Sequence, residues 1–486
     1  MKKIDDKKKI SLNIAESFKS KKFKYGGYAT VITLILIAAL VIVNLVADLV
    51  PVRIDLTTNK LYSLSEQTTE ILENLDKDVT IYYIGEQGSA NPVIEEIVQR
   101  YARLSSHIRS DYIDPVRDPL TAQKYTKDNN SLSTGNILVE CGDLFRVISQ
   151  YEMYNFRQSQ TTGEYQVESL AVEQRLTSAI LFVTGAETPV AYELQGHGEK
   201  SLTYNTKRQM ELENFEVKSL TLLGLDAVPE DAGLLIVNGP QRDLTDDELD
   251  VLKEYLANGG KMLFMMDLLI NELPKFQELL ETYGIGLTNT MVIEGEPGKF
   301  IGGNPLYVIP TYGSHEIINP IKNNNLPMFL PGAHALKEAE TLRTTLTIET
   351  LLETSDKAFG RPVTSSDTSL EKQAGDLEGP LKLAVAIEDN VYNLAANETY
   401  KARLVVIGNS DFLDVGLEGG SNLFMNSLNW IYERKDTISI RPKSLTYQPL
   451  TVTGMQLRIY GALALIIVPL ICLIAGLAVW LRRRNL

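Results

Sequence analysis

The chain has 486 residues, of which 44% are hydrophobic and 22% charged, a composition of folded protein that excludes wholesale disorder. Its formal net charge of −15 argues against a nucleic-acid-binding protein that relies on a basic surface. Cys141 and Cys472 lie far apart and form no zinc or disulfide pattern, and four histidines offer little for a metal site. We therefore expect no metal and no cofactor.

The charges are unevenly spread along the chain. Residues 1–27 hold nine lysines against three acidic residues, a net charge of +6, and the arginines at 482–484 add +3. The rest of the chain therefore carries −15 − 6 − 3 = −24. Two long apolar runs, 28–50 and 461–481, separate the basic ends from the acidic middle.

Both apolar runs have the length of a membrane-spanning helix. They contain 23 and 21 residues, and at about 1.5 Å per residue each crosses a hydrocarbon core of roughly 30 Å. A cleaved signal peptide usually has a shorter apolar stretch, so we interpret the first run as a retained anchor. Basic residues outside both runs place both termini in the cytoplasm and residues 51–460 outside the membrane.

The first part of this extracytoplasmic region, residues 51–185, has the pattern of a small α/β domain. Ser63 and Glu66 match a capping box, S-x-x-E, which predicts a helix to about Leu75. The patterns that follow predict a strand at 79–84, a helix capped by Asn91, a strand at 108–113 and a hairpin over 136–148. This order of β-α-β and hairpin resembles a thioredoxin-like layer, although Cys141 stands alone and supplies no redox pair.

From about residue 186 onward, apolar strands alternate with amphipathic helices. Thr245 and Glu248 form a second capping box at the start of one of these helices. The alternation predicts a parallel sheet covered by helices on both faces. The predicted strands are 189–194, 233–238, 261–266, 381–387 and 403–407, and the predicted helices are 203–214, 245–258, 274–283 and 421–432. Residues 284–334 form a Gly/Asn/Pro-rich region where the regular spacing loosens, and residues 363–379 are expected to be a polar loop.

A candidate site follows from the ends of these strands, because ligands of open α/β sheets bind beyond the carboxyl ends. There His197, Glu199, Asp267 and Asp411 would line an acidic pocket. Three interpretations stay open: the residues tie loops together, contact a ligand, or catalyse hydrolysis at 196–199 and 408–411. No catalytic residue or metal ligand is assigned, because no G-x-S-x-G elbow surrounds Ser410 and no spacing is metal-specific. The candidate binding residues are Gly196, His197, Gly198, Glu199, Gly239, Asp267, Asn409, Ser410 and Asp411.

Several runs, taken in order, resemble the GldG-like proteins, which are membrane-anchored auxiliary components of bacterial ABC transporters associated with gliding motility. The resemblance implies a non-enzymatic partner of a separate ATPase and permease. It also implies a glutamine-amidotransferase-like fold without the catalytic cysteine. The runs are RIDLTTNKLYSLSEQT (53–68), QRYARLSSHIRSDYIDP (99–115), GHGE (196–199), LIVNGPQRDLTDDELDVLKEYLANGGKMLFMMD (235–267), GNSDFL (408–413) and NLFMNSLNW (422–430).

The expected organisation combines these observations. Two alternatives to a role in transport stay open, an envelope protein that binds or senses a glycan or peptide, and a hydrolase. The expected segments are a cytoplasmic tail (1–27), a transmembrane helix (28–50), a thioredoxin-like domain (51–185), an amidotransferase-like domain (186–440), a juxtamembrane linker (441–460), a second transmembrane helix (461–481) and a cytoplasmic tail (482–486).

Overall fold

The structure of the protein is a computed structural model that divides into two compact units, residues 1–60 and 61–486. The described residues are 21–49, 55, 57, 59–125, 132–158, 164–268, 272–365, 369–393, 397–433, 440, 442–445, 458 and 460–484.

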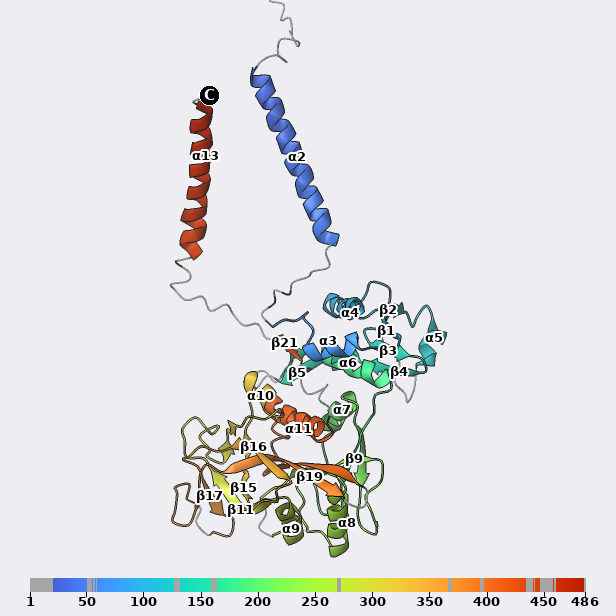
Figure 1. Ribbon diagram of the computed structural model, residues 1–486, viewed down its shortest axis with the longest axis vertical. Helices are drawn as coiled ribbons and strands as arrows, with labels where there is room; N and C mark the ends of the chain where they lie inside the picture. Colours follow the sequence, from blue (N-terminus) through green and yellow to red (C-terminus); the bar gives the residue numbers. More distant parts are fainter. Residues whose placement is uncertain are drawn as a thin grey trace, which may run out of the picture. The chain divides into compact units, whose positions relative to one another are not determined.

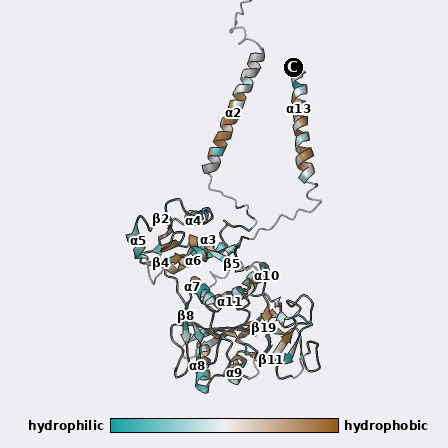
Figure 2. Ribbon diagram, turned by 180° about the vertical axis from the view of Figure 1, so that it is seen from behind, coloured by the Kyte–Doolittle hydropathy of each residue, from teal (hydrophilic) through white to brown (hydrophobic). Residues whose placement is uncertain are grey.

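In the part of the first unit that the structure describes, there is one long helix, α2 (Lys21–Leu49). Its apolar stretch, Thr30–Leu45, is exposed and is drawn in the hydrophobic colour in Figure 2. Among the described residues, the segment long and apolar enough to cross a membrane is Tyr460–Arg482, near the C-terminus. The predicted span at 28–50 is therefore helical, but its crossing of a membrane stays a prediction.

The C-terminal helix of the second unit begins with an irregular turn. A π-helical segment, Leu463–Ile467, precedes α13 (Val468–Arg484). Pro469 has no N–H to donate to the carbonyl of Leu465, so a regular α-helical bond is missing where the helix changes its winding. The rest of the segment is uncharged as far as Leu481.

The first folded part of the second unit is a sheet of the order β2-β1-β3-β4. β1 and β2 are parallel and joined by α4, whereas β3 and β4 form an antiparallel hairpin. Asn91 accepts a bond from the Val93 N–H at 2.9 Å and caps α4, as predicted. The elements are α3 (Glu66–Glu73), β1 (Val79–Ile84), α4 (Pro92–Leu104), β2 (Ile108–Ile113), α5 (Pro119–Lys124), β3 (Ile137–Cys141), β4 (Leu144–Ile148) and α6 (Val172–Val183).

The predicted cap of α3 was wrong. The N-cap is Ser65, whose side chain accepts from the Thr68 N–H, and not Ser63. The backbone N–H of Ser65 donates to Glu173 at 2.6 Å, so a carboxylate from α6 takes the place that Glu66 was expected to fill. A partner 108 residues away in sequence could not be read from a local motif.

A second, smaller sheet of the order β21-β6-β5 lies next in the chain. It pairs β5 (Tyr154–Gln158) with β6 (Tyr165–Leu170), and β6 with β21 (Lys443–Ser444). Lys443 forms an ion pair with the buried Glu173 at 2.7 Å, which ties the segment before the C-terminal helix to α6.

The large sheet is mixed, and the prediction of a purely parallel sheet was wrong (Figure 1). Its parallel part has the order β20-β10-β9-β7-β8, and β19 pairs antiparallel with β20. Only four residues separate β19 from β20, too few for the crossover that parallel strands need. The parallel strands are β7 (Val190–Leu194), β8 (Glu216–Leu220), β9 (Ala232–Asn238), β10 (Lys261–Met265) and β20 (Glu398–Ile407).

The antiparallel part extends through a region in which the sequence pattern predicted no regular element. β11 follows the turn at Gly284 and pairs with both β15 and β17. β11 and short strands occupy the Gly/Asn/Pro-rich region 284–334, and the expected polar loop at 363–379 ends in the short strand β18. The further strands are β11 (Ile285–Ile293), β13 (Thr311–Tyr312), β15 (His334–Glu338), β16 (Leu346–Glu353), β17 (Phe359–Pro362), β18 (Leu377–Glu378) and β19 (Lys382–Asn393).

Helices cover both faces of the parallel strands, as predicted. α7 (Tyr204–Leu212) and α11 (Glu418–Ile431) lie on one face, and α8 (Asp246–Ala257) and α9 (Pro274–Thr282) lie on the other (Figure 1). Successive residues of β9 enter opposite clusters: Leu234 packs with the α11 side and Leu235 with the α8 side. The capping box of Thr245 and Glu248 is present and starts α8.

Candidate functional site

The carboxyl ends of four parallel strands meet at one edge of the sheet, as the sequence analysis expected. The register pairs β7 with β9, β9 with β10, and β10 with β20. The loops after these strands carry all nine candidate residues. We call this edge, with residues 196–200, 239, 267 and 409–411, the rim.

One cluster of the rim centres on Lys200. Its ammonium lies 2.7 Å from Asp267 and 2.5 Å from Asp411. Ser410 donates its backbone N–H and its hydroxyl to Asp267, at 2.7 and 2.8 Å, and accepts from Lys200 at 2.9 Å. Burial alone would lower the pKa of Lys200, but the hydrogen bonds to Asp267 and Asp411 outweigh it and the pKa is raised.

A second cluster of the rim centres on His197, which is buried. Its Nδ1 lies 3.0 Å from Glu199 and its Nε2 lies 3.1 Å from Glu248 of α8. The hydrogen bond to Glu199 raises the pKa of His197 most, and Glu248 adds to this against the effect of burial. Both ring nitrogens face carboxylates, so the imidazolium form satisfies both contacts.

The expected single acidic pocket is therefore two clusters. His197 and Glu199 bond to each other and to Glu248, whereas Asp267, Ser410 and Asp411 gather around Lys200. Asn409 belongs to neither cluster, because its side chain is buried and bonds to the Pro331 carbonyl and the Phe412 N–H.

The glycines of the rim have conformations that other residues avoid. Gly239 has φ +61°, and a Cβ there would lie 2.7 Å from Asp267 and 3.1 Å from Ser410. Its lack of a side chain lets the loop after β9 approach the Lys200 cluster. Gly196 and Gly198 also have positive φ and turn the chain around His197.

The rim is closely packed. A cavity of about 20 Å³ at the rim, lined by Lys200, Asn238, Ser410 and their neighbours, has room for about one water molecule. The raised pKa of Lys200 keeps its amine protonated, so Lys200 cannot accept the hydroxyl proton of Ser410. In the described part of the chain, no group of three His, Cys, Asp or Glu side chains could hold a metal ion.

Two members of these clusters were missed in the sequence. Lys200 directly follows the GHGE run, and a cation next to several predicted carboxylates was the available signal. Glu248 was recognised as a helix cap, but its second role as a partner of His197 depends on a contact 51 residues away in sequence.

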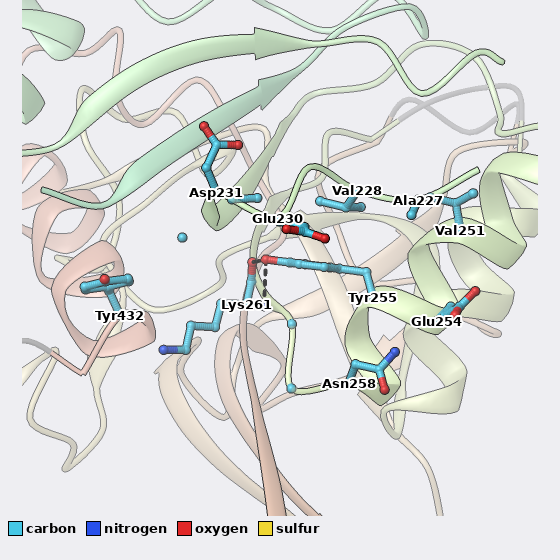
Figure 3. Close-up of a pocket in the computed structure, with 14 residues that line it drawn as sticks. Ala227, Val228, Glu230, Asp231, Val251, Glu254, Tyr255, Asn258, Lys261 and Tyr432 are labelled. Atoms are coloured by element: carbon cyan, nitrogen blue, oxygen red, sulfur yellow. Dashed lines mark hydrogen bonds between the residues drawn. The ribbon is translucent and has the colours of Figure 1, made fainter. Parts of the chain in front are cut away.

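The structure also contains larger cavities away from the rim. One, of about 480 Å³, lies at the amino edge of the sheet, where β9 and β10 begin (Figure 3). Tyr255 lines it and bonds through its hydroxyl to the backbone of Lys261, and the Lys261 ammonium lies 4.9 Å from the centre of the Tyr432 ring. This cavity was not predicted from the sequence, because the ends of parallel strands indicate a site at the carboxyl edge.

Comparison with known protein families gives two matches. Residues 189–427 match a family described as "ABC-type uncharacterized transport system". Residues 58–147 match a family described as "Domain of unknown function (DUF7088)". No curated protein matches the chain.

Solved structures resemble about half of the chain at low similarity. The mmIFT52 N-terminal domain is 19% identical, with a TM-score of 0.32, over 50% of this chain and 96% of that one. PurLQS from Thermotoga maritima is 14% identical, with a TM-score of 0.26, over 50% and 100%. A putative GMP synthase protein from Thermoplasma acidophilum is 10% identical, with a TM-score of 0.23, over 51% and 97%.

Proposed function

Because residues 189–427 match the family of ABC-type uncharacterized transport systems, we propose that this chain is a non-catalytic, membrane-anchored auxiliary subunit of an ABC transporter. It acts with a separate ATPase and a separate permease, since one or two apolar helices cannot enclose a transport path. The family match is the observation that carries this proposal. The similarity of its sequence runs to GldG-like proteins supports the same role.

The proposed topology has two spans. The segments 28–50 and 461–481 cross the membrane, both termini are cytoplasmic, and residues 51–460 are extracytoplasmic. The lysines of 1–27 and the arginines of 482–484 support this orientation through the positive-inside rule. The sheet order β2-β1-β3-β4 supports a thioredoxin-like domain over 51–185. The parallel strands support an amidotransferase-like domain over 186–440.

We also assign the rim a binding role, as the surface that contacts the transporter partner. Asp411 is the member best suited to this contact, because its side chain is 49% exposed, whereas His197, Glu199 and Asn409 are buried. The buried members hold the loops that present Asp411. Lys200, 39% exposed, keeps Asp411 in place.

Affinity purification tests the subunit proposal. The full chain is tagged, crosslinked in native membranes, extracted in mild detergent and analysed by mass spectrometry, beside an unrelated two-span protein with the same tag. We expect one ATPase and one permease in a fixed ratio with this chain only. A chain recovered alone after crosslinking would overturn the proposal.

The rim proposal has its own variant in the same experiment. Asp411→Lys reverses the exposed charge and is expected to reduce recovery of the permease severalfold. The matched control is Asp356→Lys, the same reversal at an exposed position of the large-sheet region away from the rim. Equal recovery with both variants would exclude the rim as the contact surface and leave the subunit proposal intact.

A further inference from the structure

A groove runs between the segment that carries β5, β6 and α6 and the helices α7 and α11 of the large-sheet region. Its volume is about 490 Å³, in the range of small-molecule sites. Arg208 of α7 spans the two sides, because it bonds to Glu152 at 2.9 Å through Nε. This contact joins the two walls of the groove.

Two residues that line the groove carry buried polar atoms without a hydrogen-bond partner among the described residues: Nη1 of Arg175 and Oδ1 of Asn429. Arg175 is 8% exposed and Asn429 is 1% exposed. An unpaired buried donor or acceptor costs about 1–3 kcal/mol, so such atoms are uncommon without a reason. One atom is a donor on a residue of one wall, and the other is an acceptor on a residue of the opposite wall.

The helix α11 presents a row of amides to this groove. Asn422, Asn426 and Asn429 follow one another at i, i+4 and i+7 and line it together. Their amide nitrogens are all bonded to protein oxygens, of Glu418, Ile317 and Glu213 respectively. These bonds fix the three side chains, so their orientation is set before any ligand arrives.

The lining favours a neutral ligand. Seven of its 21 residues are Asn or Gln, which both donate and accept, as hydroxyl groups require of their partners. Four glutamates stand against two arginines, so the net negative charge of the lining disfavours an anion. Phe156, 43% exposed, adds an aromatic ring that can cover the apolar face of a sugar.

We propose that this groove binds a neutral polyhydroxylated ligand, a sugar or short oligosaccharide, whose hydroxyl groups bond to Arg175 and Asn429. A hydroxyl group supplies both the donor that Asn429 Oδ1 lacks and the acceptor that Arg175 Nη1 lacks. The proposal concerns a site other than the rim and does not depend on the transporter partnership.

The test uses the full chain alone in lipid nanodiscs, because glycosidic detergents belong to the proposed ligand class. The probes are glucose, cellobiose, maltose and N,N′-diacetylchitobiose, with glucuronate as the anionic probe, followed by saturation-transfer NMR and calorimetry. We expect at least one neutral sugar to saturate. Absence of binding by all four, or tighter binding of glucuronate than of glucose, would overturn the proposal.

Two variants locate the binding in the groove. Asn429→Leu removes the unpaired acceptor and is expected to weaken binding by about tenfold or more. Phe156→Ala changes an exposed ring, leaves the fold intact and is expected to weaken binding severalfold. The control is Asn258→Leu, the same change in the cavity at the amino edge of the sheet, with no expected effect. Unchanged affinity in Asn429→Leu and Phe156→Ala would place any binding elsewhere and overturn the assignment.

A thermal-unfolding measurement separates recognition from stability. If Asn429 serves the fold, its replacement by Leu lowers the melting temperature. Because its Oδ1 bonds to nothing in the described part of the protein and Glu213 keeps its bond from Gln174, we expect a melting temperature that is unchanged or higher.

Discussion

The rim and the groove differ in whether their buried polar groups have partners. At the rim, each charged group meets opposite charges: His197 has Glu199 and Glu248, and Lys200 has Asp267 and Asp411. The unpaired Oδ1 of Asn238 there borders a space for about one water molecule. In the groove of about 490 Å³, the lining residues Arg175 and Asn429 each carry a buried atom without a partner. The difference indicates that the rim stabilises loops and presents a surface, whereas the groove has polar groups left for a ligand.

The largest expected change in unfolding free energy comes from a substitution in the His197 cluster. Glu248→Ala removes one of the two carboxylates around His197 and also the capping box of α8. Loss of one partner of a buried ion pair costs about 3–5 kcal/mol. We expect a loss of unfolding free energy in that range, measured by denaturant unfolding of the full chain.

The matched control for this change is Glu254→Ala, at an exposed position of the same helix. It is expected to change the unfolding free energy by less than about 0.5 kcal/mol. A small effect of Glu248→Ala would mean that the His197 cluster does not hold the rim together.

The second effect is a dependence of stability on pH, caused by His334, which contacts the strand end just before the rim. His334 is fully buried, its two ring nitrogens have no partner among the described residues, and burial lowers its pKa to about 4. Its backbone N–H donates to the Gly408 carbonyl, immediately before the rim residues 409–411. Between the folded pKa of about 4 and the unfolded pKa of about 6.5, the His334 imidazole is protonated in the unfolded chain but neutral in the folded chain. The stability that this histidine contributes is therefore present above pH 6.5 and lost as the pH falls toward 4.

The predicted size of this effect is about 3 kcal/mol between pH 6.5 and 4, as an order of magnitude from the shift of the pKa. His334→Leu removes the titrating group, so the variant should lose less stability than the wild type over this range. Chemical unfolding at a series of pH values measures both chains. Parallel pH profiles would show that His334 is not kept neutral by the fold.

Much of the fold could be predicted from local sequence, and the exceptions share a cause. The capping box at Thr245 and the apolar runs of β7, β9 and β10 involve only neighbours in the chain, so they could be read correctly. Contacts distant in sequence could not. The bond from Ser65 to Glu173 displaced the predicted cap of α3, and the hairpin of β19 and β20 turned a predicted parallel strand antiparallel.

The same reason explains what the sequence could reveal of the sites. The rim was foreseen because the ends of parallel strands meet wherever such a sheet forms. The groove was missed, although Asn422, Asn426 and Asn429 recur at helical spacing within a run that resembles the GldG-like proteins. Polar residues at that spacing indicate an exposed face when taken alone. The asparagines of α11 become part of a groove because α6 packs against α7 and α11. The contacts involve Ser178, Asn214 and Glu213.

The smallest expected effect concerns the Lys200–Asp411 ion pair, and it tests whether this pair stabilises the rim or only holds Asp411 at the surface. Lys200 and Asp411 are 39% and 49% exposed, and ion pairs with such access to water contribute about 0.2–1 kcal/mol. A double-mutant cycle of Lys200→Met and Asp411→Asn should therefore give a coupling energy below about 1 kcal/mol that decreases with added salt. Because Asp267 keeps its bonds from Ser410 in Asp411→Asn, the rim should stay folded while it loses its exposed charge. A coupling energy well above this range would mean that Asp411 stabilises the fold of the rim. The surface that binds the partner would then have to lie elsewhere on the large-sheet region.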